Sequence, residues 1–175
     1  MNHAAKLTHN IDTSALAAAE ITPHQKYGKL QKYARGMPGD NFGSETKNIS
    51  GIEVFLEQLP PALLERERPH VFLLELPAVD AANPVLPAHV DLNKTCGINV
   101  YLDTHGEVTK FYHWNKETRT SEYVEEFCAA TNDVWLMDTS VPHSVDLVPG
   151  KSRRMLTFSF TKTKYSEVLE CFQTA

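Results

Sequence analysis

The feature that most constrains the fold of this 175-residue chain is a succession of short β-prone runs between residues 70 and 161. These runs occupy residues 70–76, 96–102, 107–114, 120–127, 133–138 and 153–161. Many short strands joined by turns are typical of a β-sandwich or a barrel. The sequence contains no internal repeat or linker, so we expect one domain over residues 1–175 with its β core at 70–161.

Helices are predicted in the sequence both before and after this core. Residues 1–48 predict an extension dominated by loops, with one short helix near 15–21. Residues 49–66 carry apolar side chains at helical spacing and predict a supporting helix, which Pro60-Pro61 breaks or restarts. A further short helix is expected at 164–172. Because amphipathic helices normally pack on a sheet, we expect the N-terminal helices to cover one sheet.

The composition narrows the class of protein. An apolar fraction of 42% and a charged fraction of 22% are ordinary for a soluble globular domain. Seventeen basic against 22 acidic residues give a net charge of -5, which weighs against nucleic acid as a partner. The three cysteines are far apart, which favours reduced thiols and a cytoplasmic location. No apolar run approaches the length of a membrane span, so no membrane association is expected.

The clearest chemical signal is the segment His89-Val90-Asp91. Side chains at i and i+2 of an extended segment point to one face, so His89 and Asp91 could hold one metal ion. His143 is the best third ligand, because it follows a β-prone run and a proline. Two imidazoles and one carboxylate leave three positions open, as in non-haem Fe(II) oxygenases, whereas zinc favours a closed tetrahedral site or a single bound water. His113 is the rival third ligand, but its place within a predicted hairpin is more typical of a surface or wall residue.

A cation that could bind a carboxylate follows ten residues after His143. On an extended strand Arg153 shares a face with Met155, Thr157 and Ser159, and this is the more polar face. The guanidinium fork matches a carboxylate in a bidentate manner, so we predict Arg153 as the anion anchor and keep Arg154, on the opposite face, as the alternative.

Four other side chains are candidates for contacts to the same ligand. Thr157 could add a hydroxyl hydrogen bond, as could Ser159. Asn99 and Tyr101 share a strand face, and either residue could contact the ligand or simply be a packed core residue.

These residues together resemble the HxD, His and Arg pattern of Fe(II)- and 2-oxoglutarate-dependent oxygenases. Residues 94–102 and 133–145 look like the corresponding strands of small phage-type or aspartyl/asparaginyl-hydroxylase-like members, and the resemblance covers about residues 70–161. It implies a mainly β, double-stranded β-helix fold of the jelly-roll, cupin-like type. It also implies Fe(II) as the metal, 2-oxoglutarate as cosubstrate and O2 as oxidant. Halogenating relatives typically have a small residue where this chain has Asp91, so its carboxylate favours hydroxylation.

The substrate that the resemblance implies is an amino acid, a peptidyl residue or a small metabolite, and we expect residues 24–50 to contact it. The main alternative is a cupin-like metal- or anion-binding barrel without oxygenase activity. A nucleic-acid demethylase of the AlkB type is disfavoured by the acidic charge and by Ser159, where that family has a second arginine. The oligomeric state is left open.

The remaining polar residues have ordinary interpretations. We expect His3, His9 and His24 to be exposed, His70 and His105 to lie at a strand edge and a turn, and Lys94 to be solvated.

Overall fold

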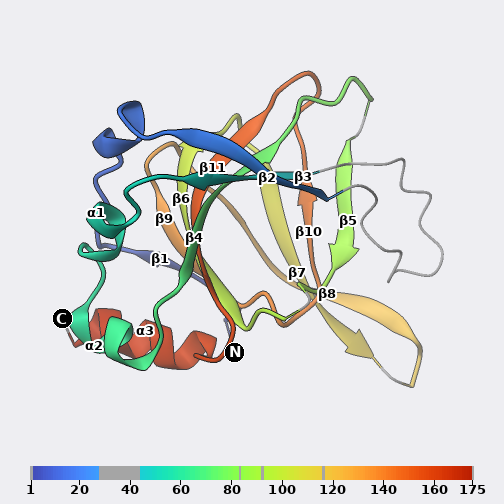
Figure 1. Cartoon of the computed structure of the whole chain (residues 1–175). Coiled ribbons are helices and arrows are strands. Elements are labelled where there is room, and N and C mark those ends of the chain that lie inside the picture. Colours follow the sequence, from blue (N-terminus) through green and yellow to red (C-terminus); the bar gives the residue numbers. More distant parts are fainter. Residues whose placement is uncertain (1, 28–43, 83, 92, 116, 175) are drawn as a thin grey trace.

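A computed structural model describes residues 2–27, 44–82, 84–91, 93–115 and 117–174. Two antiparallel sheets face each other, and short helices cover one of them (Figure 1). This is the mainly β, double-stranded β-helix fold that the sequence predicts. Most of the segment expected to contact substrate, residues 28–43, lies outside the described residues. No described helix is both long and apolar enough to span a membrane.

The larger sheet has seven strands in the order β1-β9-β6-β11-β4-β3-β2, and each neighbouring pair is antiparallel. Its strands in chain order are β1 (Ala4–Leu7), β2 (Ile21–Tyr27), β3 (Ser44–Ile49), β4 (His70–Leu76), β6 (Cys96–Asp103), β9 (Val134–Met137) and β11 (Arg153–Phe160). The central strands β6 and β11 are almost wholly buried, because both of their faces are covered.

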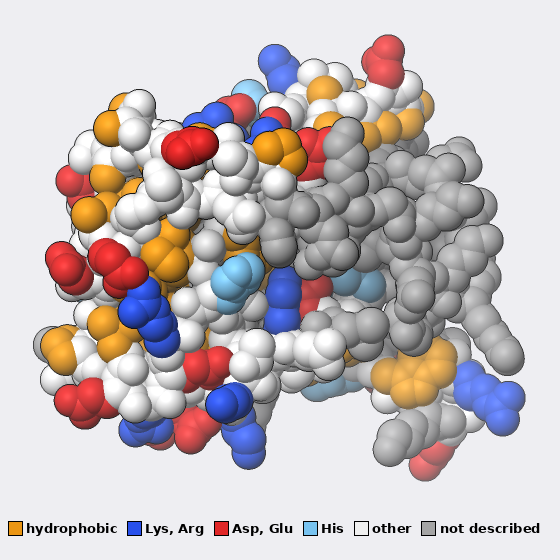
Figure 2. Space-filling model, viewed as in Figure 1, with side chains coloured by type: hydrophobic (Ala, Val, Ile, Leu, Met, Phe, Trp, Pro, Cys, Tyr) orange, Lys and Arg blue, Asp and Glu red, His pale blue; other side chains and the backbone are white. Residues whose placement is uncertain are grey.

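The smaller sheet has four strands in the order β5-β10-β7-β8. They are β5 (Val85–His89), β10 (His143–Asp146), β7 (Val108–Asn115) and β8 (Thr120–Cys128). The β7–β8 hairpin projects beyond the rest of the fold (Figure 1). On the face seen in Figure 2, hydrophobic side chains appear in small separate groups among charged and polar ones.

The alternation along β11 separates two cores. Leu156, Phe158 and Phe160 share one face of the strand and are fully buried under the helices. Met155 faces the opposite way and packs with Phe111 of the smaller sheet. The helices that complete the outer core are α1 (Glu53–Leu56), α2 (Pro61–Arg66) and α3 (Tyr165–Gln173).

Two predictions about the N-terminal third were wrong. The described part of residues 1–49 contains the strands β1, β2 and β3 where loops were expected. The helix expected near 15–21 is a single 3-10 turn, η1 (Ser14–Ala17), and β2 begins soon after it at Ile21. The helix expected over 49–66 is divided near Pro60-Pro61, as the sequence predicts. Ile49 belongs to β3, α1 ends at Leu56, and Pro61 begins α2.

Glu67 joins the end of α2 to the turn between β11 and α3. Its carboxylate accepts hydrogen bonds from the Thr161 N–H (2.8 Å) and hydroxyl (2.9 Å), the Lys162 N–H (3.0 Å) and the Thr163 N–H (2.8 Å). Partial burial acts to raise the pKa of Glu67, but these hydrogen bonds outweigh it and lower the pKa from 4.5 to about 2. The ionised carboxylate is therefore bound more favourably in the folded protein than in the unfolded chain.

We expect Glu67→Gln to lower the free energy of unfolding at neutral pH by about 1–3 kcal/mol, because hydrogen bonds to a charged acceptor are lost. A folded-state pKa below the unfolded one stabilises above the unfolded value, and this stability is lost as pH falls from about 4.5 toward 2. Urea unfolding at neutral pH and near pH 3 should thus give a smaller wild-type-to-variant difference in acid. Glu65→Gln, at an exposed position on α2, is the matched control. An equal loss at both pH values would contradict the prediction.

Candidate metal centre

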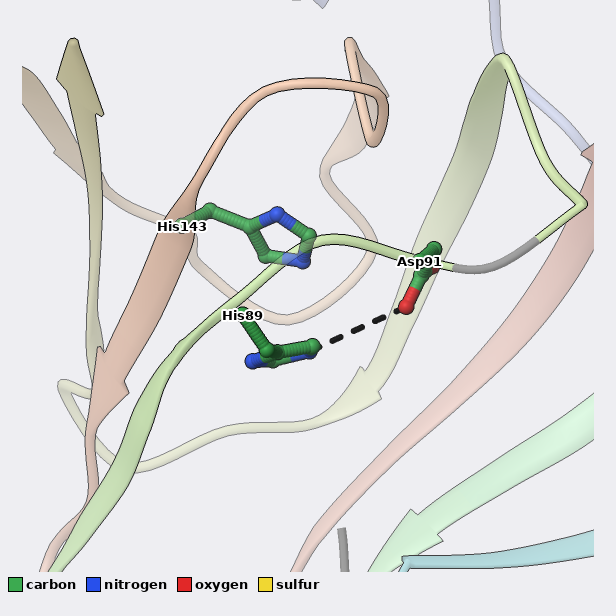
Figure 3. Close-up of side chains that lie close together, drawn as sticks. All are labelled: His89, Asp91 and His143. Atoms are coloured by element: carbon green, nitrogen blue, oxygen red, sulfur yellow. Dashed lines mark ion pairs between the residues drawn. The ribbon is translucent and has the colours of Figure 1, made fainter. Parts of the chain in front are cut away.

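The sheet register brings His89 and His143 together. His143 begins β10 and is the direct partner of His89, the last residue of β5, and their rings are 4.4 Å apart between centroids. Asp91 lies just beyond the end of β5, where its backbone N–H donates to the Thr139 carbonyl (3.1 Å). The three side chains point toward one another, as Figure 3 shows. One strand pair and one loop contact therefore bring the three candidate ligands together.

The spacing of these side chains fits a single metal ion. The His89 Nε2 and Asp91 Oδ1 atoms are 3.7 Å apart, and one ligand atom from each of the three residues lies within 4.8 Å of the others. Nitrogen and oxygen ligands contact metals of this size at about 2.0–2.2 Å. Small side-chain adjustments would therefore suffice to close the three ligands around an ion. Among the described residues this is the one group of three or more His, Cys, Asp or Glu side chains with such spacing.

Backbone carbonyls set the orientation of both imidazoles. His89 Nδ1 lies 2.7 Å from the Pro87 carbonyl oxygen, and His143 Nδ1 lies 3.0 Å from the Val141 carbonyl oxygen. A carbonyl only accepts, so each Nδ1 must carry the hydrogen and each Nε2 keeps its lone pair. Metal-binding histidines are commonly held in this way.

The charges of the site also suit a metal. Burial, together with the nearby His89, lowers the pKa of His143 to about 4, so its ring is neutral at neutral pH. Burial acts to raise the pKa of Asp91, but Lys94 and the two histidines outweigh it, and the pKa is lowered. Neutral imidazole and ionised carboxylate are the forms that bind metals.

The sequence suggested that Lys94 is solvated, but in the structure its side chain has two partners. Its ammonium group lies 3.4 Å from Asp91 Oδ2 and 5.4 Å from the centre of the Phe72 ring. Lys94 therefore places a positive charge beside the outer oxygen of the Asp91 carboxylate.

The two candidate anchor arginines lie in different environments. Arg153 is 3% exposed, whereas Arg154 is exposed to solvent. Arg153 Nη2 donates to Thr109 Oγ1 (3.3 Å), its guanidinium carbon lies 4.8 Å from the centre of the Tyr101 ring, and its buried Nε–H has no partner among the described residues. Because Arg153 is buried without a carboxylate partner among the described residues, its charge is available for an anionic ligand.

Tyr101 is fully buried beside Arg153. Burial raises the pKa of the Tyr101 hydroxyl, and Arg153 acts in the opposite direction. Thr109 was not singled out from the sequence, although its place between the inward positions Glu107 and Phe111 on one strand face was a signal for it.

The other two predicted cofactor contacts bond to each other. Thr157 Oγ1 donates to Asn99 Oδ1 (2.9 Å), and the Asn99 amide nitrogen lies 3.1 Å from Met137 Sδ. Both residues are buried on paired positions of β11 and β6. Asn99 and Thr157 thus lie on the inner side of the sheet beside Tyr101, with hydrogen-bond partners inside the protein.

Register relates the anchor to the metal centre. On β7, Phe111 pairs with His143 and Thr109 pairs with Val145. The contact of Arg153 on Thr109 therefore lies two residues along the strands from His143, which corresponds to about 7 Å. The candidate metal ligands and the Arg153 cation lie on the same inner side of the smaller sheet.

The exposure of the remaining histidines agrees with the sequence-based expectation at some positions and differs at others. His113 is exposed and is not part of the metal group, and His105 pairs with Asp103 in a turn (3.3 Å). His3, expected to be exposed, is 5% exposed and stacks against Phe111, so that prediction was wrong. The side chain of His24 lies outside the described residues.

Comparison with known proteins identifies a shared fold and no family. No model of a protein family and no curated sequence matches the chain. Among solved structures, the chain is similar to an oxidoreductase of the 2OG-Fe(II) oxygenase family from Burkholderia pseudomallei, with a TM-score of 0.51 and 14% identity over 86% of this chain and 77% of that one. At this identity the likeness shows a shared fold alone.

Two further structures have lower scores. A Pseudomonas putida prolyl-4-hydroxylase gives a TM-score of 0.49 and 10% identity over 93% of this chain and 94% of that one. A 7S globulin from Momordica charantia gives 0.43 and 10% identity over 69% of this chain, which spans 30% of the globulin.

Proposed function

We propose that this protein is an Fe(II)- and 2-oxoglutarate-dependent dioxygenase that hydroxylates an amino acid, a peptidyl residue or a small metabolite. The observation that carries the proposal is the pairing of a two-histidine, one-carboxylate group with a buried arginine that has no carboxylate partner among the described residues. Neither feature alone distinguishes an oxygenase from a barrel that binds a metal or an anion.

His89, Asp91 and His143 would hold the metal through the two Nε2 atoms and the carboxylate. This ligand set leaves three positions for a chelating cosubstrate and O2. When bound, Fe(II) would supply hydroxylation chemistry in which O2 is the oxidant and 2-oxoglutarate is oxidised to succinate and carbon dioxide. The hydrogen bonds to the Pro87 and Val141 carbonyls keep both imidazoles in the tautomer that can bind.

Arg153 would bind the distal carboxylate of 2-oxoglutarate. The separation of about two residues between its Thr109 contact and His143 is comparable to the length of a five-carbon diacid. Stacking against Tyr101 and burial between the sheets hold the guanidinium in place, and exclusion of water strengthens its attraction for an anion.

The test begins with anaerobic protein, to which Fe(II) and then 2-oxoglutarate are added. We expect a weak visible metal-to-ligand absorption band, followed by succinate release once air is admitted. His143→Ala should remove both, whereas His105→Ala, in the β6–β7 turn, should retain both. Metal binding without a band or succinate would instead support the cupin-like binding barrel.

A further inference from the structure

A second group of polar side chains lies beside the metal centre and has no part in holding the metal. Its central residue is His3, just before β1, whose side chain is 5% exposed. The His3 backbone N–H donates to the Glu125 carboxylate, and its carbonyl accepts from the Asp138 N–H (2.8 Å). The backbone of His3 is thus fixed by both β8 and the end of β9.

Two connections place His3 near the candidate metal ligands. Phe111 neighbours both rings, because its ring centroid is 6.0 Å from the His3 ring and 6.0 Å from the His143 ring. Asp138, which pairs with His3, immediately precedes Thr139, the residue whose carbonyl holds the Asp91 backbone. His3 therefore borders the same end of the barrel as the metal centre.

The His3 ring has one unused polar atom. Its Nδ1 lies 3.7 Å from Asp138 Oδ2, and its Nε2 is buried with no hydrogen-bond partner among the described residues. A carboxylate only accepts, so Asp138 favours the tautomer with hydrogen on Nδ1 and leaves Nε2 as an acceptor. A buried acceptor without a partner is costly, which indicates that a ligand donates to it in the working protein.

The charges around this atom select the kind of donor. Asp138 and Glu125 both contact His3, and Glu122 pairs across the hairpin with His113, whose ring meets the His3 ring at 5.2 Å. The described cation nearest the metal centre, Lys94, is turned to Asp91 and Phe72. A group that donates hydrogen bonds and carries positive charge matches this environment best.

We infer that His3 Nε2, with the carboxylates of Asp138 and Glu125, forms a subsite for the protonated amino group of the substrate. This inference rests on the proposed oxygenase function and narrows its substrate class to amines. His3 would accept a hydrogen bond from the ammonium group, and the two carboxylates would balance its charge. Binding there would hold the amino end of the substrate beside Phe111, with the rest of the substrate extending toward the His89, Asp91 and His143 group.

The test measures succinate release by the Fe(II)-loaded protein with 2-oxoglutarate and a panel of amines. The panel contains L-lysine, L-ornithine, cadaverine and a short peptide with one lysine, each paired with its counterpart acetylated at the amine. We expect at least one amine to stimulate succinate release and its acetylated counterpart to fail. His3→Ala and His3→Asn should then raise the KM for that amine about tenfold or more, because a hydrogen bond to a charged group is lost.

A conservative variant separates binding from folding. The amide oxygen of His3→Gln can reach the position of Nε2, so its KM should stay within about threefold of wild type, whereas Asn ends near Nδ1. His105→Ala is the histidine control, and the anaerobic absorption band on each sample reports whether the metal centre has assembled.

Stimulation by the acetylated compounds, an unchanged KM in His3→Ala, or a band without stimulation by any amine would each overturn the subsite and leave the proposed oxygenase intact. Absence of the band in the wild type would count against the oxygenase itself.

Discussion

Replacing Asp91 by alanine should abolish detectable succinate formation and weaken Fe(II) binding by about 100-fold or more. Changes to residues that merely support metal ligands already cost about 10–100-fold in affinity, and Asp91 is proposed as a ligand itself. The loss also removes the negative charge that offsets the metal. Two imidazoles, each held through Nδ1, would remain as a weak bidentate site.

Metal affinity in this variant can be measured without turnover. A ligand that binds only the folded state raises the unfolding temperature, so Fe(II) or Co(II) should stabilise the wild type and leave Asp91→Ala almost unaffected. Asp103→Ala is the matched control, since Asp103 is half-exposed and pairs with His105 in a turn. A metal-induced stabilisation that survives in Asp91→Ala would exclude this carboxylate as a ligand.

More of the candidate site than of the N-terminal fold could be predicted from the sequence, because the signal for the site lies in residues close together in the chain. His89-Val90-Asp91 carries its geometry within three residues, and His143 follows a recognisable strand. Even so, Asp91 lies beyond the strand rather than within it, and the contact that returns its carboxylate to His89 is made by the distant Thr139. Sequence spacing predicted that His89 and Asp91 lie together, but not the loop contact that positions Asp91.

The N-terminal strands could not be predicted because their stability comes from distant partners. β2 contains Pro23, a residue that disfavours a strand, and its pairing with β3 is irregular between Pro23 and Gln25. The two strands therefore lack a regular alternation of apolar and polar residues that would reveal them in the sequence. β1 is four residues long and is held by β9, more than 120 residues away. Strand formation of this kind depends on tertiary context more than on local propensity.

Two individual side chains were misjudged for the same reason. His3 has no patterned neighbours, and its burial arises from Phe111 and Asp138, which are remote in sequence. Lys94 has its partner Asp91 three residues away, but without a helix that spacing predicts no contact. In both cases the fold, and not the local sequence, creates the environment.

Replacing Arg153 by methionine should affect ligand binding and stability in opposite directions. We expect the KM for 2-oxoglutarate to rise about 100-fold, because two charge-assisted hydrogen bonds to its distal carboxylate would be lost. The ligand-free protein should become more stable by about 1–4 kcal/mol, since a buried charge without a carboxylate partner among the described residues gives way to an apolar side chain of similar length. Loss of the Thr109 hydrogen bond reduces this gain.

Arg154→Met is the matched control, because the two arginines are adjacent on β11 and point to opposite faces. The exposed Arg154 should change the free energy of unfolding by no more than about 0.5 kcal/mol and leave the KM for 2-oxoglutarate unchanged. Urea unfolding without ligand and succinate release at varied 2-oxoglutarate measure the two effects separately. A raised KM in Arg154→Met with none in Arg153→Met would move the anchor to the outer face. A loss of stability in Arg153→Met would mean that the guanidinium stabilises the packing of the two sheets, and would contradict its role as a binding site for an anion.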